Sequence, residues 1–272
     1  QRILSEPSAV FGDWTANIIE DATIDDLDPD AIRMAREKYT ERHEIRAKEI
    51  ESWDDATFLN KAKITRAGKI TNAAIILLGR EESEHFLSPA VCVIRWKLLA
   101  KEDKNKDFHN FHVPMIKSVE EITTGYIRNN NYVYTVSGNI FPENMMRYDV
   151  FTLREPICNA IGHQDYGMGA RIELLEYEDE KLVIQNYGQF IPNSVEDVVE
   201  KDCPDSRYRN PFLMEAMCNI GMAETEGGGI RKLFVQQKKR FFPMPIYDLS
   251  GQKVRCEIQG KVLVTVRDRC TV

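Results

Sequence analysis

The sequence predicts an α+β fold, in which helices are interspersed with antiparallel strands. Its clearest signal is a β-hairpin: residues 171–177 and 181–185 alternate apolar and polar side chains on either side of an acidic turn. Helical patterns flank this hairpin, and two more alternating segments, 254–258 and 262–266, close the chain. With 272 residues, 43% of them hydrophobic, the chain is long enough for two domains or one large one.

The amino-terminal third is predicted to be mostly helical. Asp28 followed by Pro29 is a favourable helix start, and it predicts a charged amphipathic helix over 30–52 with His43 facing solvent. Thr71 is expected to cap a short apolar helix that ends at Leu78. The other elements expected in this part are a helix over 53–63 and a strand over 91–99.

A charged connector at 101–107 is the best candidate for a domain boundary, dividing the chain into regions 1–107 and 108–272. The second region then continues with a further series of elements. In order, these are a helix over 118–129, a strand over 132–136, a helix over 151–166, the hairpin, helices over 195–200 and 211–220, and a helix after Gly229.

The helix over 151–166 carries a row of polar side chains. Glu155, Asn159 and His163 are spaced i, i+4 and i+8, so they share one face of an otherwise apolar helix. A carboxylate can orient or deprotonate a water molecule, and a carboxamide oxygen is a hard ligand suited to Mg²⁺. This row is therefore interpreted as one wall of a nucleotide-phosphate site.

A second interpretation of the same helix remains open. Thr152 and Glu155 have the spacing of a capping box, in which Glu155 would only reach back to the backbone at the start of the helix. Pro156 agrees with this interpretation, because proline is tolerated in the first turn of a helix.

Two glycine-containing segments follow downstream. Asn186 and Gly188 lie at the end of the second hairpin strand, where an amide could meet a flat base edge or where the strand could simply turn away. The run Gly227–Gly229 precedes a helical pattern. It would let the backbone approach phosphate at a helix N-terminus, or it could be an ordinary flexible helix entry.

Taken together, these motifs resemble the GHKL ATPases, of the gyrase, Hsp90, histidine kinase and MutL type. More specifically, they resemble the divergent ATPase-like domain of RecG-related transcriptional regulators. The matching segments are Leu153-Arg-Glu155, Asn159-Ala160, His163-Gln-Asp165-Tyr166, Asn186-Tyr-Gly188, Ser206-Arg-Tyr-Arg-Asn-Pro211 and Glu226-Gly-Gly-Gly-Ile230. The segment 70–79 also resembles the stretch that precedes this domain in the same family.

The resemblance implies a GHKL (Bergerat-type) α/β sandwich with a mixed sheet, preceded by a smaller α/β region. It implies ATP and Mg²⁺ as ligands, Glu155 as the residue that orients the attacking water, and Asn159 as the Mg²⁺ contact. Residues 201–226 would occupy the position of the ATP lid, where Arg207 and Arg209 reach phosphate or, alternatively, form a surface ion pair. The nucleotide-binding residues implied are Asn159, His163, Asn186, Gly188, Arg207, Arg209, Gly227, Gly228 and Gly229.

One departure from the family pattern concerns the base. GHKL enzymes usually carry an aspartate where this chain has Asn186, whose oxygen accepts a hydrogen bond without the assistance of a charge. Whether ATP is hydrolysed is therefore left open, and a nucleotide-free structural or dimerisation domain is the alternative. The resemblance also implies DNA binding through flanking AlbA-like (Schlafen-type) and winged-helix domains, and a homodimer is a further expectation.

Composition narrows the class of protein. No apolar run approaches the length of a membrane-spanning helix, no P-loop motif is present, and a net charge of −7 disfavours strong non-specific binding to nucleic acid. The six cysteines form no C-x-x-C pair, which indicates reduced thiols and disfavours zinc. We therefore expect a cytoplasmic protein, and the missing initiator Met suggests that this sequence is a fragment.

Overall fold

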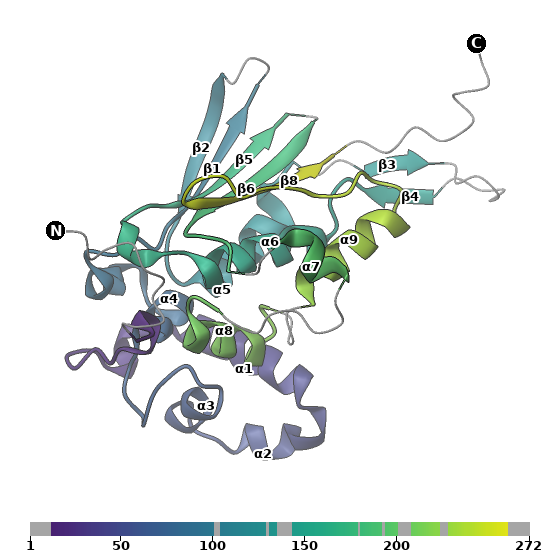
Figure 1. The fold of residues 1–272 in the computed structure, drawn as a ribbon. Helices are drawn as coiled ribbons and strands as arrows, with labels where there is room; N and C mark the ends of the chain where they lie inside the picture. Colours follow the sequence, from purple (N-terminus) through teal and green to yellow (C-terminus); the bar gives the residue numbers. More distant parts are fainter. Residues whose placement is uncertain are drawn as a thin grey trace, which may run out of the picture.

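A computed structural model describes residues 12–100, 104–128, 131–134, 143–178, 180–191, 194–200, 208–223 and 228–260. It has the expected α+β architecture, built on a six-stranded mixed sheet (Figure 1). The helices are α1 Pro29–Arg42, α2 Ala47–Glu51, α3 Asp55–Lys61, α4 Asn72–Leu78, α5 Met115–Glu121, α6 Val150–His163, α7 Val195–Glu200, α8 Pro211–Asn219 and α9 Gly229–Lys239. The strands are β1 Ile94–Leu99, β2 Asn105–Phe111, β3 Asn131–Tyr134, β4 Glu143–Met146, β5 Ile172–Tyr177, β6 Lys181–Tyr187, β7 Ile246–Asp248 and β8 Lys253–Gln259.

The main sheet has the strand order β2-β1-β5-β6-β8-β7. Strands β1 and β5 run parallel, and every other neighbouring pair in this sheet is antiparallel. The predicted hairpin is confirmed as β5 and β6, with Tyr177 opposite Lys181 and Glu173 opposite Gln185. The edge strand β7 is too short for alternation to reveal it in the sequence, and the predicted strand at 262–266 lies outside the described residues.

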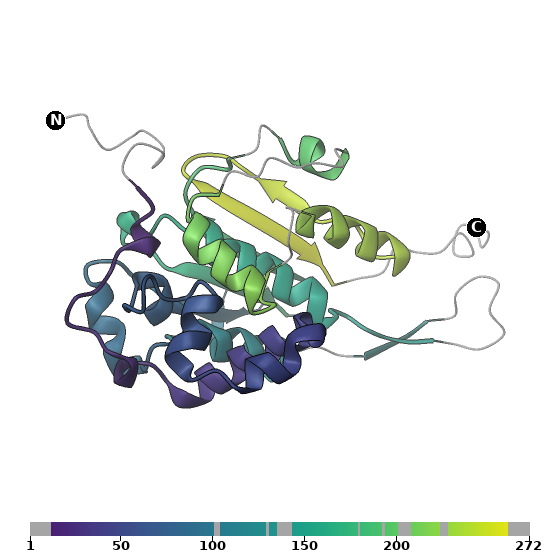
Figure 2. The same ribbon diagram turned by 90° about the horizontal axis from the view of Figure 1, so that it is seen from below.

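Helices α5, α6 and α9 lie along one face of the main sheet, with α6 directly against β6 (Figure 1). Leu182, Ile184 and Asn186 alternate with their neighbours along β6 and so share this helix-covered face. Strands β3 and β4 form a separate two-stranded sheet that projects from the body of the molecule (Figure 2).

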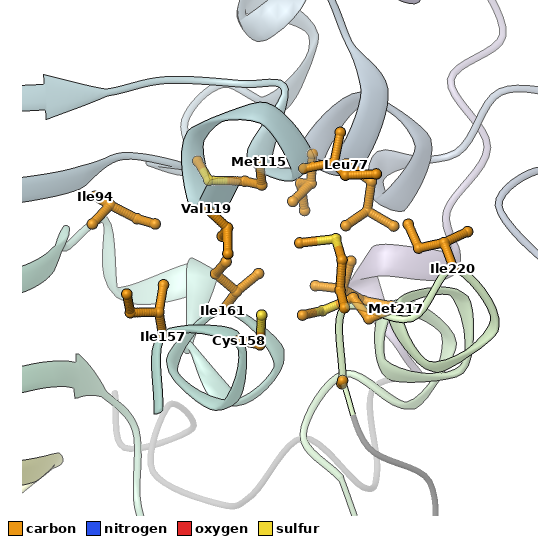
Figure 3. Close-up of a cluster of buried hydrophobic side chains, with 14 of the residues drawn as sticks. Leu77, Ile94, Met115, Val119, Ile157, Cys158, Ile161, Met217 and Ile220 are labelled. Carbon is orange, nitrogen blue, oxygen red and sulfur yellow. The ribbon is translucent and has the colours of Figure 1, made fainter. Parts of the chain in front are cut away.

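Helix α8 and the amino-terminal helices form a further layer beneath α5 and α6 (Figures 1 and 2). Side chains from β1, α4, α5, α6 and α8 meet in one buried cluster, shown in Figure 3: Leu77, Ile94, Met115, Val119, Ile157, Cys158, Ile161, Met217 and Ile220. The predicted boundary at residue 107 falls inside β2, which pairs with β1. The hydrophobic core therefore runs continuously from the amino-terminal helices to the sheet.

Two helix predictions need correction. The predicted helix over 30–52 is interrupted at His43, whose Nδ1 contacts the carbonyl oxygen of Tyr39 at 2.8 Å and whose ring stacks on that of Tyr39. His43 is thus partly buried, and its side chain competes with the backbone hydrogen bond that would continue the helix. The helix expected at 118–129 begins earlier, at Met115, and continues into a π-helical turn over Ile122–Tyr126.

The prediction for Thr71 is confirmed. Its hydroxyl accepts a hydrogen bond from the backbone N–H of Ala74 at 3.1 Å, which is the geometry of an N-cap. In the part of the chain that the structure describes, no helix has the length and apolar character needed to cross a membrane.

Candidate functional site

The polar row on α6 is present, but its first member is not a helix cap. Asp149 caps α6 by accepting a hydrogen bond from the N–H of Thr152, and Pro156 lies within the helix rather than in its first turn. Glu155 is only 2% exposed, and its Oε1 accepts a hydrogen bond from Asn159 Nδ2 at 3.0 Å. The capping-box interpretation of Glu155 is therefore wrong, and Glu155 and Asn159 form a hydrogen-bonded pair.

The amino terminus of α9 meets this pair. A Cβ atom added to Gly229, the first residue of α9, would lie 1.4 Å from Glu155 Oε1 and 2.3 Å from its Cδ. By contrast, a Cβ at Gly228 would meet no atom within 4 Å. Of the two glycines of this run that the structure describes, Gly229 approaches a carboxylate of its own chain, and Gly228 does not.

Tyr247, from the edge strand β7, lies close to the same carboxylate. Burial raises the pKa of the Tyr247 phenol well above its usual value, and the Glu155 carboxylate contributes to the rise. The Tyr247 ring also stacks on Phe234 of α9, with 6.3 Å between ring centroids. Glu155 therefore lies close both to the start of α9 and to the edge strand β7.

His163, the third member of the row, lies near the other end of α6. Its ring centroid is 5.6 Å from that of Tyr208. Burial lowers the pKa of His163 to about 4, and the positive charge of Arg209 acts in the same direction. His163 is consequently neutral at pH 7. It stands roughly 12 Å from Glu155 along the helix axis, at 1.5 Å per residue.

Asn186 and Gly188 lie beside this His163 end, because the backbone N–H of Asp165 donates to the carbonyl of Tyr187 at 2.8 Å. Asn186 is 5% exposed, and its Nδ2 donates to the same Tyr187 carbonyl at 3.3 Å. Gly188 has a φ of 121°, a conformation that favours glycine. This part of the site joins the end of β6 to the end of α6.

Arg209 lies flat against Gly188. A Cβ atom at Gly188 would be 2.8 Å from Arg209 Nε and 3.1 Å from its Cζ. The guanidinium pairs with Asp165 at 3.3 Å and donates to the carbonyl of Gln189 at 3.2 Å. With a side chain only 8% exposed, this is not the surface ion pair considered from the sequence. Arg209 stands at the Asn186 end, and Arg207 and Gly227 lie outside the described residues.

Two further residues hold this end together, and they were not singled out from the sequence. Gln164 is fully buried; its Oε1 accepts from the N–H of Tyr187, and its Nε2 donates to the carbonyl of Ala170. Asn210 Nδ2 donates to the carbonyls of Gly162 and Gln164, at the carboxyl end of α6. Gln164 and Asn210 both lie in the motifs that resemble the RecG-related family, and that resemblance is the feature of the sequence that could have identified them.

The chemistry of the donor set fits a magnesium nucleotide. Mg²⁺ prefers oxygen ligands and is usually held by one or two protein groups together with phosphate and water. Asn159 offers a carboxamide oxygen as a possible ligand, next to the carboxylate of Glu155 and the N-terminus of α9. The Asn186 end, about two helical turns away, offers an amide next to a glycine that Arg209 covers.

Comparisons with known proteins agree with this architecture. Residues 169–258 match the family described as "Putative ATP-dependent DNA helicase recG C-terminal", and residues 1–94 match a domain of unknown function, DUF8451. No curated protein matches the chain.

The fold is also similar to that of a solved structure, the DIP2311 protein from Corynebacterium diphtheriae. The TM-score is 0.70 at 16% sequence identity, and the match covers 92% of this chain and 48% of that one. The chain thus spans about half the length of that protein and shares its fold. We conclude that residues 169–258 are similar to an ATPase-like domain of the RecG-related type.

Proposed function

We propose that this chain binds an adenine nucleotide together with Mg²⁺ between α6, α9 and the end of β6. The observation that carries the proposal is the convergence of Glu155, Asn159 and Gly229 at one place, although α6 and α9 are far apart in the sequence. The match of residues 169–258 to an ATPase-like family supports the same proposal.

In this proposal, the two ends of the site have different tasks. Asn186 Oδ1 accepts a hydrogen bond from the amino group of adenine, and the bare backbone of Gly188 allows the base to approach. Asn159 supplies the protein's Mg²⁺ contact, and Gly228 and Gly229 bring the N-terminus of α9 to phosphate. Gly227 and Arg207 are proposed to act at the phosphate end as well.

Arg209 is also proposed as a nucleotide-binding residue, but from the base end. Its guanidinium lies on Gly188, so a base that approaches this glycine must contact Arg209 or displace it. His163 is proposed to support the site indirectly, because its neutral ring lies between α6 and Tyr208.

Hydrolysis of ATP would also require a residue that orients the attacking water. Glu155 is the residue that we propose to orient the attacking water, one helical turn before Asn159. General-base assistance is typically worth about 10²–10⁴-fold in rate. Glu155→Gln should reduce phosphate release by about that factor while keeping the shape of the side chain. A variant with the turnover of the parent would show that Glu155 has no part in the chemistry.

The proposed binding can be tested by calorimetry and by thermal melting. ADP or ATP at a hundredfold excess over the dissociation constant should stabilise the fold by about 2.7 kcal/mol. Flat calorimetry and an unchanged melting temperature with millimolar nucleotide and Mg²⁺ would refute nucleotide binding.

The alternative is a domain that has lost its nucleotide and serves as a structural or dimerisation core. A specific observation favours it: the Asn186 amide already bonds to Tyr187, and Arg209 already covers Gly188. Size-exclusion chromatography with light scattering would test the dimer, and it should be run with and without nucleotide.

The wider role is proposed from the resemblance. We infer that the chain is the ATP-binding core of a cytoplasmic transcriptional regulator, which contacts DNA through flanking domains. The match to about half of a longer protein supports the presence of further domains. A DNA-binding assay on the longest available form of the protein, with this chain alone as control, would test that inference.

A further inference from the structure

The carboxylate of Glu155 lies at the N-terminus of α9. It is buried, it lies against the first residue of that helix, and its Oε1 accepts a hydrogen bond from Asn159. The partial positive charge of a helix N-terminus favours a negative group at this place. A side chain of α6 thus supplies an anion to the start of α9.

Helix α9 does not supply an anion of its own. Gly228, at its N-cap position, has no side chain, and the first turn contains no acidic residue. That turn instead contains Arg231 and Lys232, two exposed cations at the end of the helix where the dipole disfavours positive charge. The backbone at this end of α9 carries a partial positive charge, which makes it a suitable place for an anion.

We propose that Glu155 is an internal stand-in for nucleotide phosphate, so that the described conformation is self-blocked and phosphate competes with this carboxylate for the N-terminus of α9. The inference rests on the proposed function and specifies how its site is regulated. An entering phosphate must displace the carboxylate, because two anions within a few ångströms repel each other strongly in a partly buried site. When the carboxylate of Glu155 moves off the N-terminus of α9, its hydrogen bond with Asn159 breaks and the carboxamide is released to meet a metal ion.

The proposal predicts that removal of an acidic side chain from the proposed binding site improves binding. Glu155→Ala should bind ADP in EDTA at least about tenfold more tightly than the parent, since both the competing charge and its bulk are gone. Glu155→Gln should shift affinity in the same direction by less, because it removes the charge and keeps the bulk. Isothermal titration with ADP in EDTA, and separately with inorganic pyrophosphate, would measure both effects.

Glu120→Gln is the matched control. It removes one negative charge from an exposed position on α5 and so reports the effect of net charge alone. Circular dichroism should confirm that every variant is folded. If Glu155→Ala does not fold, the near-isosteric Glu155→Gln decides the question.

The outcomes separate this proposal from the proposed function. If the parent binds ADP and neither Glu155 variant binds it more tightly than Glu120→Gln does, the stand-in role is refuted and nucleotide binding stands. If the Glu155 variants gain affinity for pyrophosphate but ADP binds no better than pyrophosphate, the stand-in role holds and the adenine site is refuted. If no variant binds either probe, both proposals are refuted.

Discussion

Replacement of Gly229 by alanine is the most direct test of the contact between α6 and α9. The new Cβ would lie 1.4 Å from Glu155 Oε1, whereas ordinary contact begins near 3.4 Å. The carboxylate must therefore retreat by about 2 Å, and the buried surroundings of Glu155 resist that movement. Gly228→Ala is the matched control, because its Cβ meets no atom within 4 Å.

The expected magnitude follows from two opposing effects. Forcing an extra methyl group into a well-packed site typically costs about 1–3 kcal/mol. Replacement of glycine by alanine within a helix typically raises the free energy of unfolding by about 0.5–1 kcal/mol. The net loss in the free energy of unfolding for Gly229→Ala should be about 1–2 kcal/mol, which lowers the melting temperature by about 2–6 °C. Gly228→Ala should stay within about 0.5 kcal/mol of the parent.

Urea denaturation of four proteins would check this reasoning: the parent, Gly229→Ala, Glu155→Ala and the double variant. With the Glu155 side chain removed, Gly229→Ala should no longer destabilise the fold, so the double-mutant cycle should show a coupling of about 1 kcal/mol or more. Additive effects of the two substitutions would refute the contact, and so would a Gly229→Ala variant as stable as Gly228→Ala.

Three further predictions concern α6. Asn159→Ala should weaken Mg²⁺-ADP binding but not metal-free ADP binding in titration calorimetry; equal losses in both would remove the metal role. Burial lowers the pKa of His163 from 6.5 in the free side chain to about 4 in the native state. The unfolded chain therefore binds a proton at a higher pH than the native chain does. As a result, the free energy of unfolding decreases as the pH falls from about 6.5 to 4. The decrease in the free energy of unfolding should reach about 3 kcal/mol. Urea titrations at pH 7 and pH 4.5 should show a smaller decrease for His163→Gln than for the parent. An equal decrease in the two proteins would show that His163 is not the group responsible. A Cβ at Gly162 would lie 1.9 Å from Met214 Sδ of α8, so Gly162→Ala should cost about 1–3 kcal/mol in the same assay, whereas Gly125→Ala, with no atom within 4 Å of its Cβ, should show no such clash.

Elements with a strong local period could be predicted from the sequence. Strand β5 alternates buried and half-buried residues with a period of two over its whole length, and the Thr71 cap satisfies a backbone N–H within its own turn. Strand β6 does not alternate in this way, because it is buried at every position from Leu182 to Asn186. The spacing of Glu155, Asn159 and His163 likewise follows from helical geometry alone. In each case the determining interactions lie within a few residues of one another.

Local signals failed where distant groups compete with them. Pro156 suggested a first turn, but Asp149 caps the helix earlier and Pro156 lies inside it. The expectation that Arg209 reaches phosphate stays a prediction. In the described structure Arg209 pairs with Asp165 and lies against Gly188, where α6 meets β6.

The fold class, the hairpin, the polar face of α6 and the glycine run before α9 could be predicted, because periodicity and chain chemistry specify these features locally. The contact of Gly229 with Glu155 and the position of Arg209 over Gly188 emerge only when the chain is folded. Those contacts join segments far apart along the chain, and their distances depend on how the helices pack on the sheet. No pattern of neighbouring residues specifies that packing.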